Sequence, residues 1–432
     1  MSDSTRAGIA SATRYVLPNG MVALIHRNPS TPTVSVLGEV LAGAVHEPAP
    51  RSGVAALTAA ALIRGAGERS FQQIVAETEA RGCSVNAGGG LHVSSFGGKA
   101  LVEDLPLVLD ILADMLARPT FPANEVEKLR GQFLIGLRES EQETGARAMR
   151  AVRELLYPAE HPYSRLSSGT LETVQAIGRD DLAAFHAGYS PEGATIAVVG
   201  DVEPAAVIEA LEARFGPWAP GPAPRLELPP VPPLAEVRRR EIAMSGKVQA
   251  DLVWAVHGLA RTDPDYYAAM MANLILGRLG MGGRLGENVR ENQGMAYYCY
   301  SGLEADLGAG PWLAVAGVSP DNVERAVEAV LHEVRRFAAE GPTAQELADA
   351  RDFRTGSIVL GLETNDGIAG TLLAIERFGL GLDFIARYPA LIGAISAEQI
   401  VAAARRYLST DAYALAVAGP PAGGAGLAGG GR

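Results

Sequence analysis

Hydrophobic residues recur at helical spacing in two matching places along the chain. Residues 105–118 (LPLVLDILADMLAR) predict an amphipathic helix, and a proline-containing turn separates it from a second helix that begins at Glu125. Residues 323–337 (VERAVEAVLHEVRRF) predict the same kind of helix, and a Gly-Pro-Thr turn leads to a helix that begins at Glu346. The two second helices begin 221 residues apart (346 minus 125), which indicates an internal repeat.

Each half of the chain also closes with a helix, a short loop and an apolar strand. In the first half, residues 180–187 predict the helix and residues 194–200 the strand. In the second half, residues 397–408 and 412–419 have the same patterns in the same order. The fold class predicted from this repeat is α+β: a duplicated unit in which helices pack on one side of each sheet.

A proline-rich stretch over residues 216–233 (GPWAPGPAPRLELPPVPP) separates the two copies. Proline cannot continue a helix or a central strand, so the stretch predicts an extended linker. We therefore expect an N-terminal domain over residues 1–217, a linker over 218–235 and a C-terminal domain over 236–419. The Gly- and Ala-rich composition of residues 420–432 predicts a flexible tail.

Composition narrows the class of protein. The chain has 432 residues, of which 48% are hydrophobic and 20% charged, so it can bury large cores. A formal net charge of −12 argues against binding to nucleic acid or to an anionic membrane. No signal-peptide core or membrane-spanning run is visible, which predicts a cytoplasmic protein. The two cysteines, Cys83 and Cys299, are predicted to be buried small hydrophobes, not a disulfide.

The stretch from residue 283 to 302 (GRLGENVRENQGMAYYCYSG) carries the strongest chemical pattern. It predicts a short polar helix that stops at Gly294 in left-handed geometry, followed by a tyrosine-rich strand over 295–303. Arg290 would lie in the last helical turn and Tyr297 near the start of the strand, able to converge on one pocket. A guanidinium and a phenol are donors that can hold a carbonyl or a developing oxyanion.

Strand alternation distinguishes the tyrosines of this stretch. A regular strand places Tyr297 on the same face as Met295 and Cys299, and places Tyr298 and Tyr300 on the other face. Tyr297 is therefore the expected partner of the arginine, its alternative being a packed ring with a satisfied hydroxyl.

Other residues of the stretch have structural interpretations. Arg290 itself could offset the helix dipole and pair with Glu287. Arg284 is expected in a solvent-exposed position or a structural ion pair. The glycines between Gly277 and Gly286 predict close backbone packing or a hinge. They do not predict a phosphate loop, because no Gly-Lys-Ser/Thr follows and the segment comes after a helix.

These residues resemble the C-terminal half-site of the pitrilysin/insulinase family of zinc peptidases, the inverzincins, which include the mitochondrial processing peptidases. The resemblance rests on Gly282-Gly283, Arg284-Leu285, Val289-Arg290-Glu291 and Gly294-Met295-Ala296-Tyr297. It implies two α/β-sandwich domains that form one half of a clamshell. It also implies that Arg290 and Tyr297 are the Arg/Tyr pair that contacts substrate.

The zinc half-site of that family is absent from the matching segment, GVAALTAAALIRGAG. The two histidines and the glutamate of its H-x-x-E-H motif fall on Ala56, Ala59 and Ala60. The third ligand, a glutamate, falls near Gly136 or Leu137. Because alanine supplies no donor and a zinc site needs about four, we expect no zinc in this chain and zinc in a partner subunit.

The histidines offer no replacement site in sequence. None has a histidine three or four residues away, and none lies in a zinc-peptidase motif. His46-Glu47 comes at the end of a predicted strand without further support. The seven histidines are His26, His46, His92, His161, His186, His257 and His332. A Ser–His–Asp site also lacks support, because no G-x-S-x-G motif occurs.

The resemblance implies a non-catalytic subunit of a heterodimeric zinc endopeptidase. In this interpretation the chain is inactive alone and supplies Arg290 and Tyr297 to a homologous subunit with an intact H-x-x-E-H motif, which cleaves the peptide. The alternative is a scaffold or peptide-binding relative in which both half-sites have degenerated. Retention of the Arg/Tyr pair argues against that alternative, and the three alanines disfavour a self-sufficient peptidase.

Overall fold

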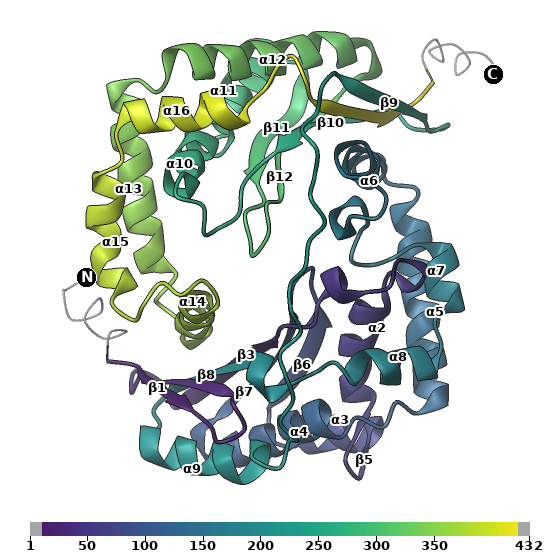
Figure 1. Ribbon diagram of the computed structural model, residues 1–432, viewed down its shortest axis with the longest axis vertical. Helices are drawn as coiled ribbons and strands as arrows, with labels where there is room; N and C mark the ends of the chain where they lie inside the picture. The colour runs from purple at the N-terminus through teal and green to yellow at the C-terminus, as the bar shows by residue number, and fades with distance from the viewer. Residues whose placement is uncertain (1–10, 422–432) are drawn as a thin grey trace, which may run out of the picture. The chain divides into compact units, whose positions relative to one another are not determined.

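The computed structural model describes residues 11–421 (Figure 1). The tail predicted from residue 420 therefore lies almost wholly outside the described residues. The chain forms two compact units, each assembled from three stretches. The first unit combines residues up to Leu137 with Leu166–Glu227 and Ser357–Pro389, and the second combines Arg138–Arg165, Leu228–Gly356 and residues from Ala390 onward.

The first unit contains a six-stranded mixed sheet in the order β1-β2-β8-β3-β7-β6. Its strands are β1 (Thr13–Val16), β2 (Val22–Arg27), β3 (Thr33–Val40), β6 (Ser84–Gly89), β7 (Ser94–Leu101) and β8 (Ala194–Gly200). Only β2 and β8 run parallel among these neighbours. The register places Val36 of β3 between Val198 and Gly98.

Helices and a two-stranded ribbon complete the first unit. The ribbon pairs β4 (Gly65–Ala66) with β5 (Arg69–Ser70). The helices are α2 (Val54–Ala61), α3 (Phe71–Glu79), α4 (Leu105–Ala117), α5 (Ala123–Ser140), α7 (Leu171–Ala176), α8 (Arg179–His186), α9 (Pro204–Phe215) and α14 (Asn365–Arg377). Apolar residues of α2, α4 and α9 share one core with the sheet. The helices predicted at residues 105 and 125 are confirmed.

The second unit contains a five-stranded sheet in the order β11-β12-β10-β13-β9. Its strands are β9 (Arg238–Ala243), β10 (Ala250–His257), β11 (Ala296–Leu303), β12 (Pro311–Val318) and β13 (Ala414–Gly419). Its helices are α6 (Thr144–Leu156), α10 (Tyr266–Gly277), α11 (Gly283–Leu285), α12 (Val323–Glu340), α13 (Ala344–Leu360), α15 (Phe384–Gly393) and α16 (Ala397–Tyr407). Helix α5 continues into this unit, and α13 and α15 extend back into the first.

The topology confirms the internal repeat and the α+β fold class. The order β6-β7-β3-β8-β2 in the first sheet corresponds strand for strand to β11-β12-β10-β13-β9 in the second. The one parallel pair occupies the same place in both, β8 with β2 and β13 with β9. The proline-rich linker separates the two copies of the repeat in the sequence. Each compact unit, in contrast, combines stretches from both sides of the linker.

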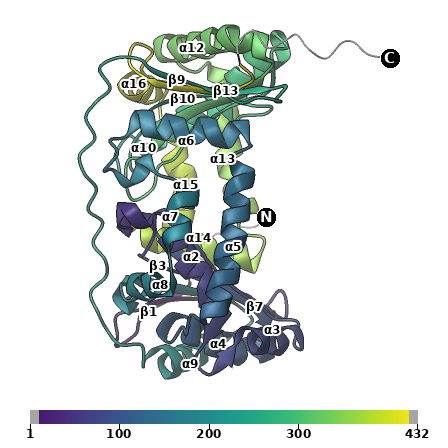
Figure 2. The same ribbon diagram turned by 90° about the vertical axis from the view of Figure 1, so that its right-hand side faces the viewer.

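Each sheet carries helices on both faces, so the prediction of a one-sided layer was wrong. Strands β12 and β13 are buried at every position, which requires cover on both faces. Figure 2 shows α12 on one side of the second sheet and α6 on the other. In the first unit α14 packs on β3 and β8. Helices α6 and α14 begin 221 residues apart, so each sheet is covered by a helix from the opposite half of the sequence.

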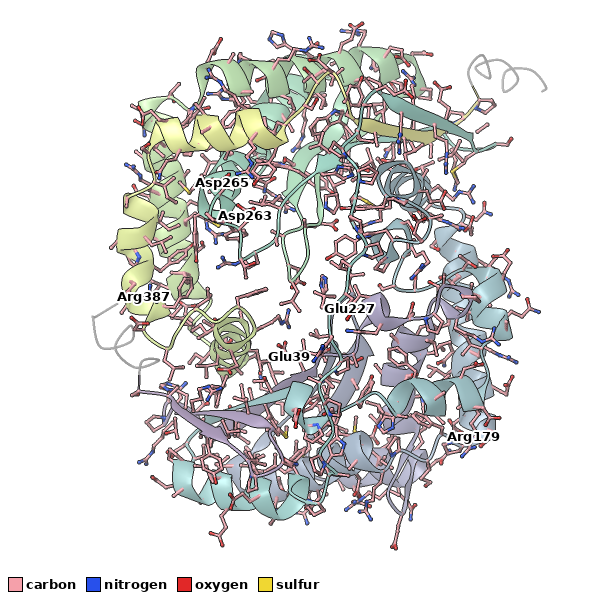
Figure 3. All side chains as sticks on the ribbon, viewed as in Figure 1. Glu39, Arg179, Glu227, Asp263, Asp265 and Arg387 are labelled. Carbon is pink, nitrogen blue, oxygen red and sulfur yellow. The ribbon has the colours of Figure 1, made fainter. Side chains whose placement is uncertain are left out.

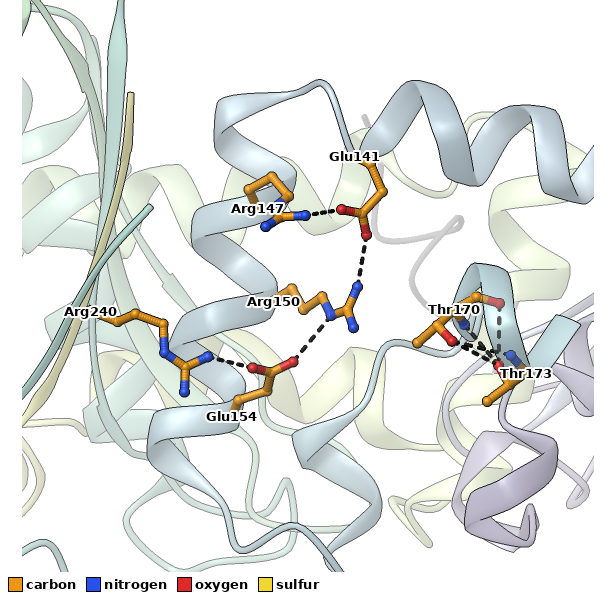
Figure 4. Close-up of polar contacts among 7 residues, drawn as sticks. All are labelled: Glu141, Arg147, Arg150, Glu154, Thr170, Thr173 and Arg240. Carbon is orange, nitrogen blue, oxygen red and sulfur yellow. Dashed lines mark hydrogen bonds and ion pairs between the residues drawn. The ribbon is translucent and has the colours of Figure 1, made fainter. Parts of the chain in front are cut away.

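Arginines anchor both of these covering helices. Figure 4 shows Glu141 accepting from Arg147 and Arg150, while Glu154 accepts from Arg150 and from Arg240 of β9. The Arg150 bonds measure 2.8 Å to Glu141 and 3.1 Å to Glu154. These bonds tie α6 to the edge strand of its sheet.

Helix α14 is fastened in the same manner. Its last residue, Arg377, donates from Nε to Oε1 of Glu39 on β3 at 2.8 Å (Glu39 is labelled in Figure 3). In the second unit, Arg406 of α16 pairs with Asp265 at the start of α10 at 2.8 Å. Helices distant in sequence are thus joined by side chains that local patterns do not reveal.

Residues 219–235 form neither helix nor strand and are drawn as an extended segment in Figure 2. Between residues 11 and 421, no single helix is both long and apolar enough to cross a membrane. Helices α13 and α14, which are bent sharply at the break between them, reach that length and composition only as a pair.

Candidate functional site

The stretch singled out in the sequence folds as predicted in outline. Helix α11 leads into a π-helical turn, η7 (Gly286–Asn292), and β11 follows after a short gap. Gly294 lies in that gap at φ +60°, the left-handed geometry expected of a residue that ends a helix. The π-helical form was not predicted. Such wide turns are rare and often mark functional sites.

Two glycines allow the backbone to pack closely before η7. Gly282 has φ +114° and Gly283 has φ +59°. A Cβ on Gly282 would lie 2.6 Å from the carbonyl oxygen of Cys299, and one on Gly283 would lie 2.4 Å from that of Ile275. Both the dihedral angle and the contacts exclude a side chain. The predicted role of this glycine cluster in close backbone packing is confirmed.

Arg284 makes a buried structural ion pair, one of its two expected roles. The residue is only 7% exposed, and its guanidinium donates to both carboxylate oxygens of Glu346 at 2.6 and 2.7 Å. It also donates to the carbonyl oxygen of Gly341 at 2.8 Å. Arg284 therefore fastens α11 to the turn between α12 and α13.

The partner carboxylate is itself part of a helix cap. Glu346 accepts from the backbone N–H of Thr343 at 2.7 Å, and its own N–H donates to the Thr343 hydroxyl at 3.1 Å. Burial opposes ionisation of Glu346, but the hydrogen bonds from Arg284 and Thr343 outweigh it and lower its pKa to about 2.

A second bond and two apolar residues hold α11 and η7 in place. Asn288 donates to Glu333 of α12 at 2.6 Å. Leu285 and Val289, one helical turn apart, are completely buried. Together these contacts make the segment a firm platform with one face against α12.

Arg290 lies on the more open side of this platform. Its side chain is 36% exposed, and its Nε lies 3.4 Å from Oε1 of Glu291. The acidic partner is thus the adjacent residue and not Glu287, the alternative considered from the sequence. An exposed, locally paired guanidinium remains available to a ligand.

Tyr297 lies in a β-bulge, which overturns the predicted face assignment. Ala296 pairs with Val318, whereas Tyr298 pairs with the next residue, Gly317, so one extra residue is inserted at Tyr297. The Tyr297 ring is 81% exposed, while Met295 and Cys299 are buried. A regular alternation predicted a shared face, and the bulge breaks that alternation. Tyr297 is still more exposed than Tyr298, but the bulge and not strand alternation is the reason.

Within the part of the chain that the structure describes, Arg290 and Tyr297 share no hydrogen bond or cation–π contact. Both lie on irregular backbone, one in a π-helical turn and the other in a bulge. Their convergence on a substrate stays a prediction.

The neighbouring Tyr298 belongs to a polar cluster that sequence reasoning missed. Its hydroxyl donates to Asp251, which is 3% exposed at the start of β10. Asp251 also accepts from the Thr144 hydroxyl of α6 and from Gln249 Nε2 at 3.2 Å. The available signal was a single carboxylate in an otherwise apolar strand, ADLVWAVH. Burial and hydrogen bonding to Asp251 raise the pKa of Tyr298.

The positions that correspond to the zinc ligands lie on α2. Ala56 and Ala59 are buried, and a Cβ on Gly89 of β6 would lie 2.6 Å from the Cα of Ala56. Helix α2 therefore packs closely on β6 through residues that have only methyl groups or hydrogen. Ala60 is partly buried on the same helix.

The remaining corresponding positions, Gly136 and Leu137, lie on α5 and supply no donor either. Among residues 11–421, no three or more His, Cys, Asp or Glu side chains are grouped to hold a metal ion. The residues present at these positions do not fit a zinc ion. The correspondence with the zinc ligands stays a prediction.

Comparisons with known proteins match both halves of the chain. Residues 22–170 match a family model described as insulinase (peptidase family M16), and residues 176–353 match one described as peptidase M16 inactive domain. An uncharacterized zinc protease of Streptomyces coelicolor is 28% identical over 82% of this chain and 78% of its own length. The beta subunit of the mitochondrial-processing peptidase of Saccharomyces cerevisiae is 24% identical over 82% of this chain and 79% of its own.

Solved structures match over nearly the whole chain. A peptidase M16 inactive domain from Pseudomonas fluorescens superposes with a TM-score of 0.88 at 27% identity, covering 95% of this chain and 98% of its own. A protease from Helicobacter pylori gives a TM-score of 0.87 at 17% identity, covering 95% of this chain and 100% of its own. The second similarity concerns the fold alone.

Proposed function

The chain belongs to peptidase family M16, the insulinase/pitrilysin family, and we propose that it is the non-catalytic subunit of a two-chain zinc endopeptidase. Its partner would be a homologue with an intact H-x-x-E-H motif. The partner would supply the zinc chemistry, and this chain would supply donors to the peptide carbonyl.

One observation carries the proposal: the positions on α2 that correspond to the zinc ligands have apolar side chains, whereas those of the Arg/Tyr pair have exposed polar groups. Ala56 and Ala59 are buried methyl groups packed in the first unit. Arg290 and Tyr297, in contrast, have exposed polar ends on a platform held by buried bonds. A ligand can reach an exposed guanidinium and an exposed phenol, whereas buried methyl groups offer it no contact.

The chemistry of the pair suits a carbonyl oxygen that gains negative charge. A guanidinium donates through a planar fork, and a phenol donates through one O–H. Donors fixed before the reaction stabilise the developing charge more than mobile water does. In this proposal Arg290 and Tyr297 bind and orient the scissile carbonyl of a peptide.

The test uses this chain co-purified with an H-x-x-E-H homologue encoded in the same genome. The pair should form a heterodimer on sizing chromatography and cleave a quenched fluorescent peptide, whereas this chain alone should not. Arg290→Ala and Tyr297→Phe should each lower turnover by about 10²–10³-fold without changing assembly. Matched controls are Arg325→Ala, at an exposed position of α12, and Tyr300→Phe, on the same strand as Tyr297; both should keep full activity.

Two outcomes would contradict the proposal. If the chains stay separate at micromolar concentration, the subunit role is wrong. If they assemble and both site variants cleave at the wild-type rate, the scaffold alternative replaces it. One matching family model and one similar structure are described as a peptidase M16 inactive domain. The scaffold alternative is therefore the one that the site variants must be tested against.

A further inference from the structure

A pocket of about 340 Å³ lies in the first unit, away from the residues discussed so far. The pocket forms where the segment between β3 and α2 packs beside α8. Helices α2 and α8 contact each other (Figure 1). Its volume falls in the range of small-molecule sites. Ala42, Val54, Phe185 and Pro224 provide apolar walls, and Arg51 and His46 are among its polar residues.

Arg51 offers donors to this pocket. Its Nε donates to Oδ1 of Asp181 at 2.8 Å. The other oxygen of Asp181 accepts from the backbone N–H of Gly178 at 2.8 Å, in the cap of α8. Within residues 11–421, the terminal nitrogens Nη1 and Nη2 of Arg51 have no protein acceptor. The guanidinium can therefore bind a carboxylate through its outer edge.

His46 also lines the pocket. Both ring nitrogens are shielded from solvent, and they lie near the backbone of Gly43 and Arg225 without a hydrogen bond of normal geometry. Burial lowers the pKa of His46, so the neutral ring still carries one N–H. A ligand in the pocket cannot reach these shielded nitrogens, so His46 contributes to the wall and offers no hydrogen bond.

The carboxylates at the pocket already have partners. Each oxygen of Asp181 accepts one hydrogen bond, and its charge is paired with Arg51. Glu47 lies beside the pocket, but its carboxylate accepts from the backbone N–H groups of Gly53 and Ala55 at the start of α2. A free amino acid would give up hydration of its charged amine and would have to share carboxylate oxygens that already accept hydrogen bonds, which costs free energy. An acylated residue avoids this cost.

We propose that this pocket binds the C-terminal residue of a peptide, with its apolar side chain against Val54 and Phe185 and its carboxylate on Arg51. The site lies in a different unit from Arg290 and goes beyond the function proposed above. It needs neither a partner subunit nor catalysis, so it can be tested on this chain alone.

Calorimetry on the purified chain would use three probes: acetyl-leucine, acetyl-leucine amide and free leucine. Acetyl-leucine should bind at least about tenfold more tightly than the amide, since only the acid can engage the guanidinium edge. A tetrapeptide that ends in leucine should behave as acetyl-leucine does, and free leucine should bind more weakly. Equal binding of acid and amide, tighter binding of free leucine, or no binding of any probe would overturn the proposal.

Two variants test the residues named. Arg51→Gln should weaken the acid by about tenfold and leave the amide unchanged, while Arg27→Gln, at an exposed arginine of the same unit, should change neither. Ala184→Phe places a ring at the pocket from an exposed position on α8, so it should block every probe without disturbing the core. Unaltered binding in Arg51→Gln or in Ala184→Phe would show that the probe binds elsewhere.

Discussion

The ion pair between Arg284 and Glu346 should make a measurable, pH-dependent contribution to stability. The perturbation is Glu346→Gln, which keeps the shape of the side chain and removes its charge. The pKa of Glu346 is lowered from 4.5 to about 2 in the folded state, a difference of about 2.5. At about 1.36 kcal/mol per pKa unit this corresponds to ~3.4 kcal/mol at neutral pH. The Glu346 side chain is 25% exposed, so solvent screening reduces the figure to roughly 2 kcal/mol.

The variant also leaves Arg284, which is 7% exposed, without its counter-charge. Removal of one partner from a buried pair typically costs about 3–5 kcal/mol. We therefore expect Glu346→Gln to lower the free energy of unfolding by about 3 kcal/mol at neutral pH. The cost falls at the low end because part of the pair reaches solvent.

The sign of the pH dependence follows from the lowered pKa. The unfolded carboxylate takes up a proton near its ordinary value, before the folded one does, so acid favours the unfolded state. The stabilisation is complete above pH 4.5 and is lost as the pH falls toward about 2. Between neutral pH and about pH 3.5 the difference between wild type and variant should shrink by roughly 1 kcal/mol.

Urea unfolding followed by circular dichroism at several pH values measures this difference. Asp201→Asn is the control, because Asp201 pairs with Arg27 at 3.2 Å on the open surface, where such a pair contributes less than about 1 kcal/mol. An equal difference at neutral pH and at about pH 3.5 would refute the electrostatic argument. A difference under about 1 kcal/mol at neutral pH would refute the structural role of the pair.

Four further outcomes follow from the structure. Elemental analysis of the dialysed chain should find zinc far below one equivalent, and a stoichiometric, chelator-sensitive content would contradict the assignment of the α2 alanines. Asp251→Asn disturbs three hydrogen bonds, so it should lower the free energy of unfolding in urea by about 2 kcal/mol. Tyr298→Phe removes only one of these bonds and should lower it by less. Cys83 and Cys299 are buried and have raised pKa values, so a thiol reagent should label neither until urea is added. In the assembled pair, Arg290→Lys should keep little activity, since an ammonium lacks the planar fork; near-normal turnover would show that charge alone suffices.

Sequence patterns predicted the elements that depend on neighbours in the chain. The helix at residues 105–118 follows from its apolar spacing, and the turn at Gly294 follows from its place after a polar helix. The ion-pair role considered for Arg284 was correct, but its partner, Glu346, lies 62 residues away and could not be found locally.

The errors arose where tertiary structure overrides local periodicity. A single inserted residue at Tyr297 changes which strand positions share a face, and no residue type announces such a bulge. The polar cluster at Asp251 joins α6, β10 and β11, three elements that only the fold brings together. The second helix layer was missed for the same reason.

The exchange of α6 and α14 has a consequence for how the protein is made. The last strand of the first sheet ends at Gly200, but the helix that covers β3 and β8 ends at Arg377. A ribosome adding about 5–20 residues per second needs roughly 9 to 35 seconds to cross that interval. Throughout it, the nascent sheet has an apolar face with nothing to cover it, which is a target for chaperones and for aggregation. If the gene were divided at the proline-rich linker, each of the two products would lack the helix that covers one face of its sheet. We therefore expect each product to aggregate unless both are expressed together.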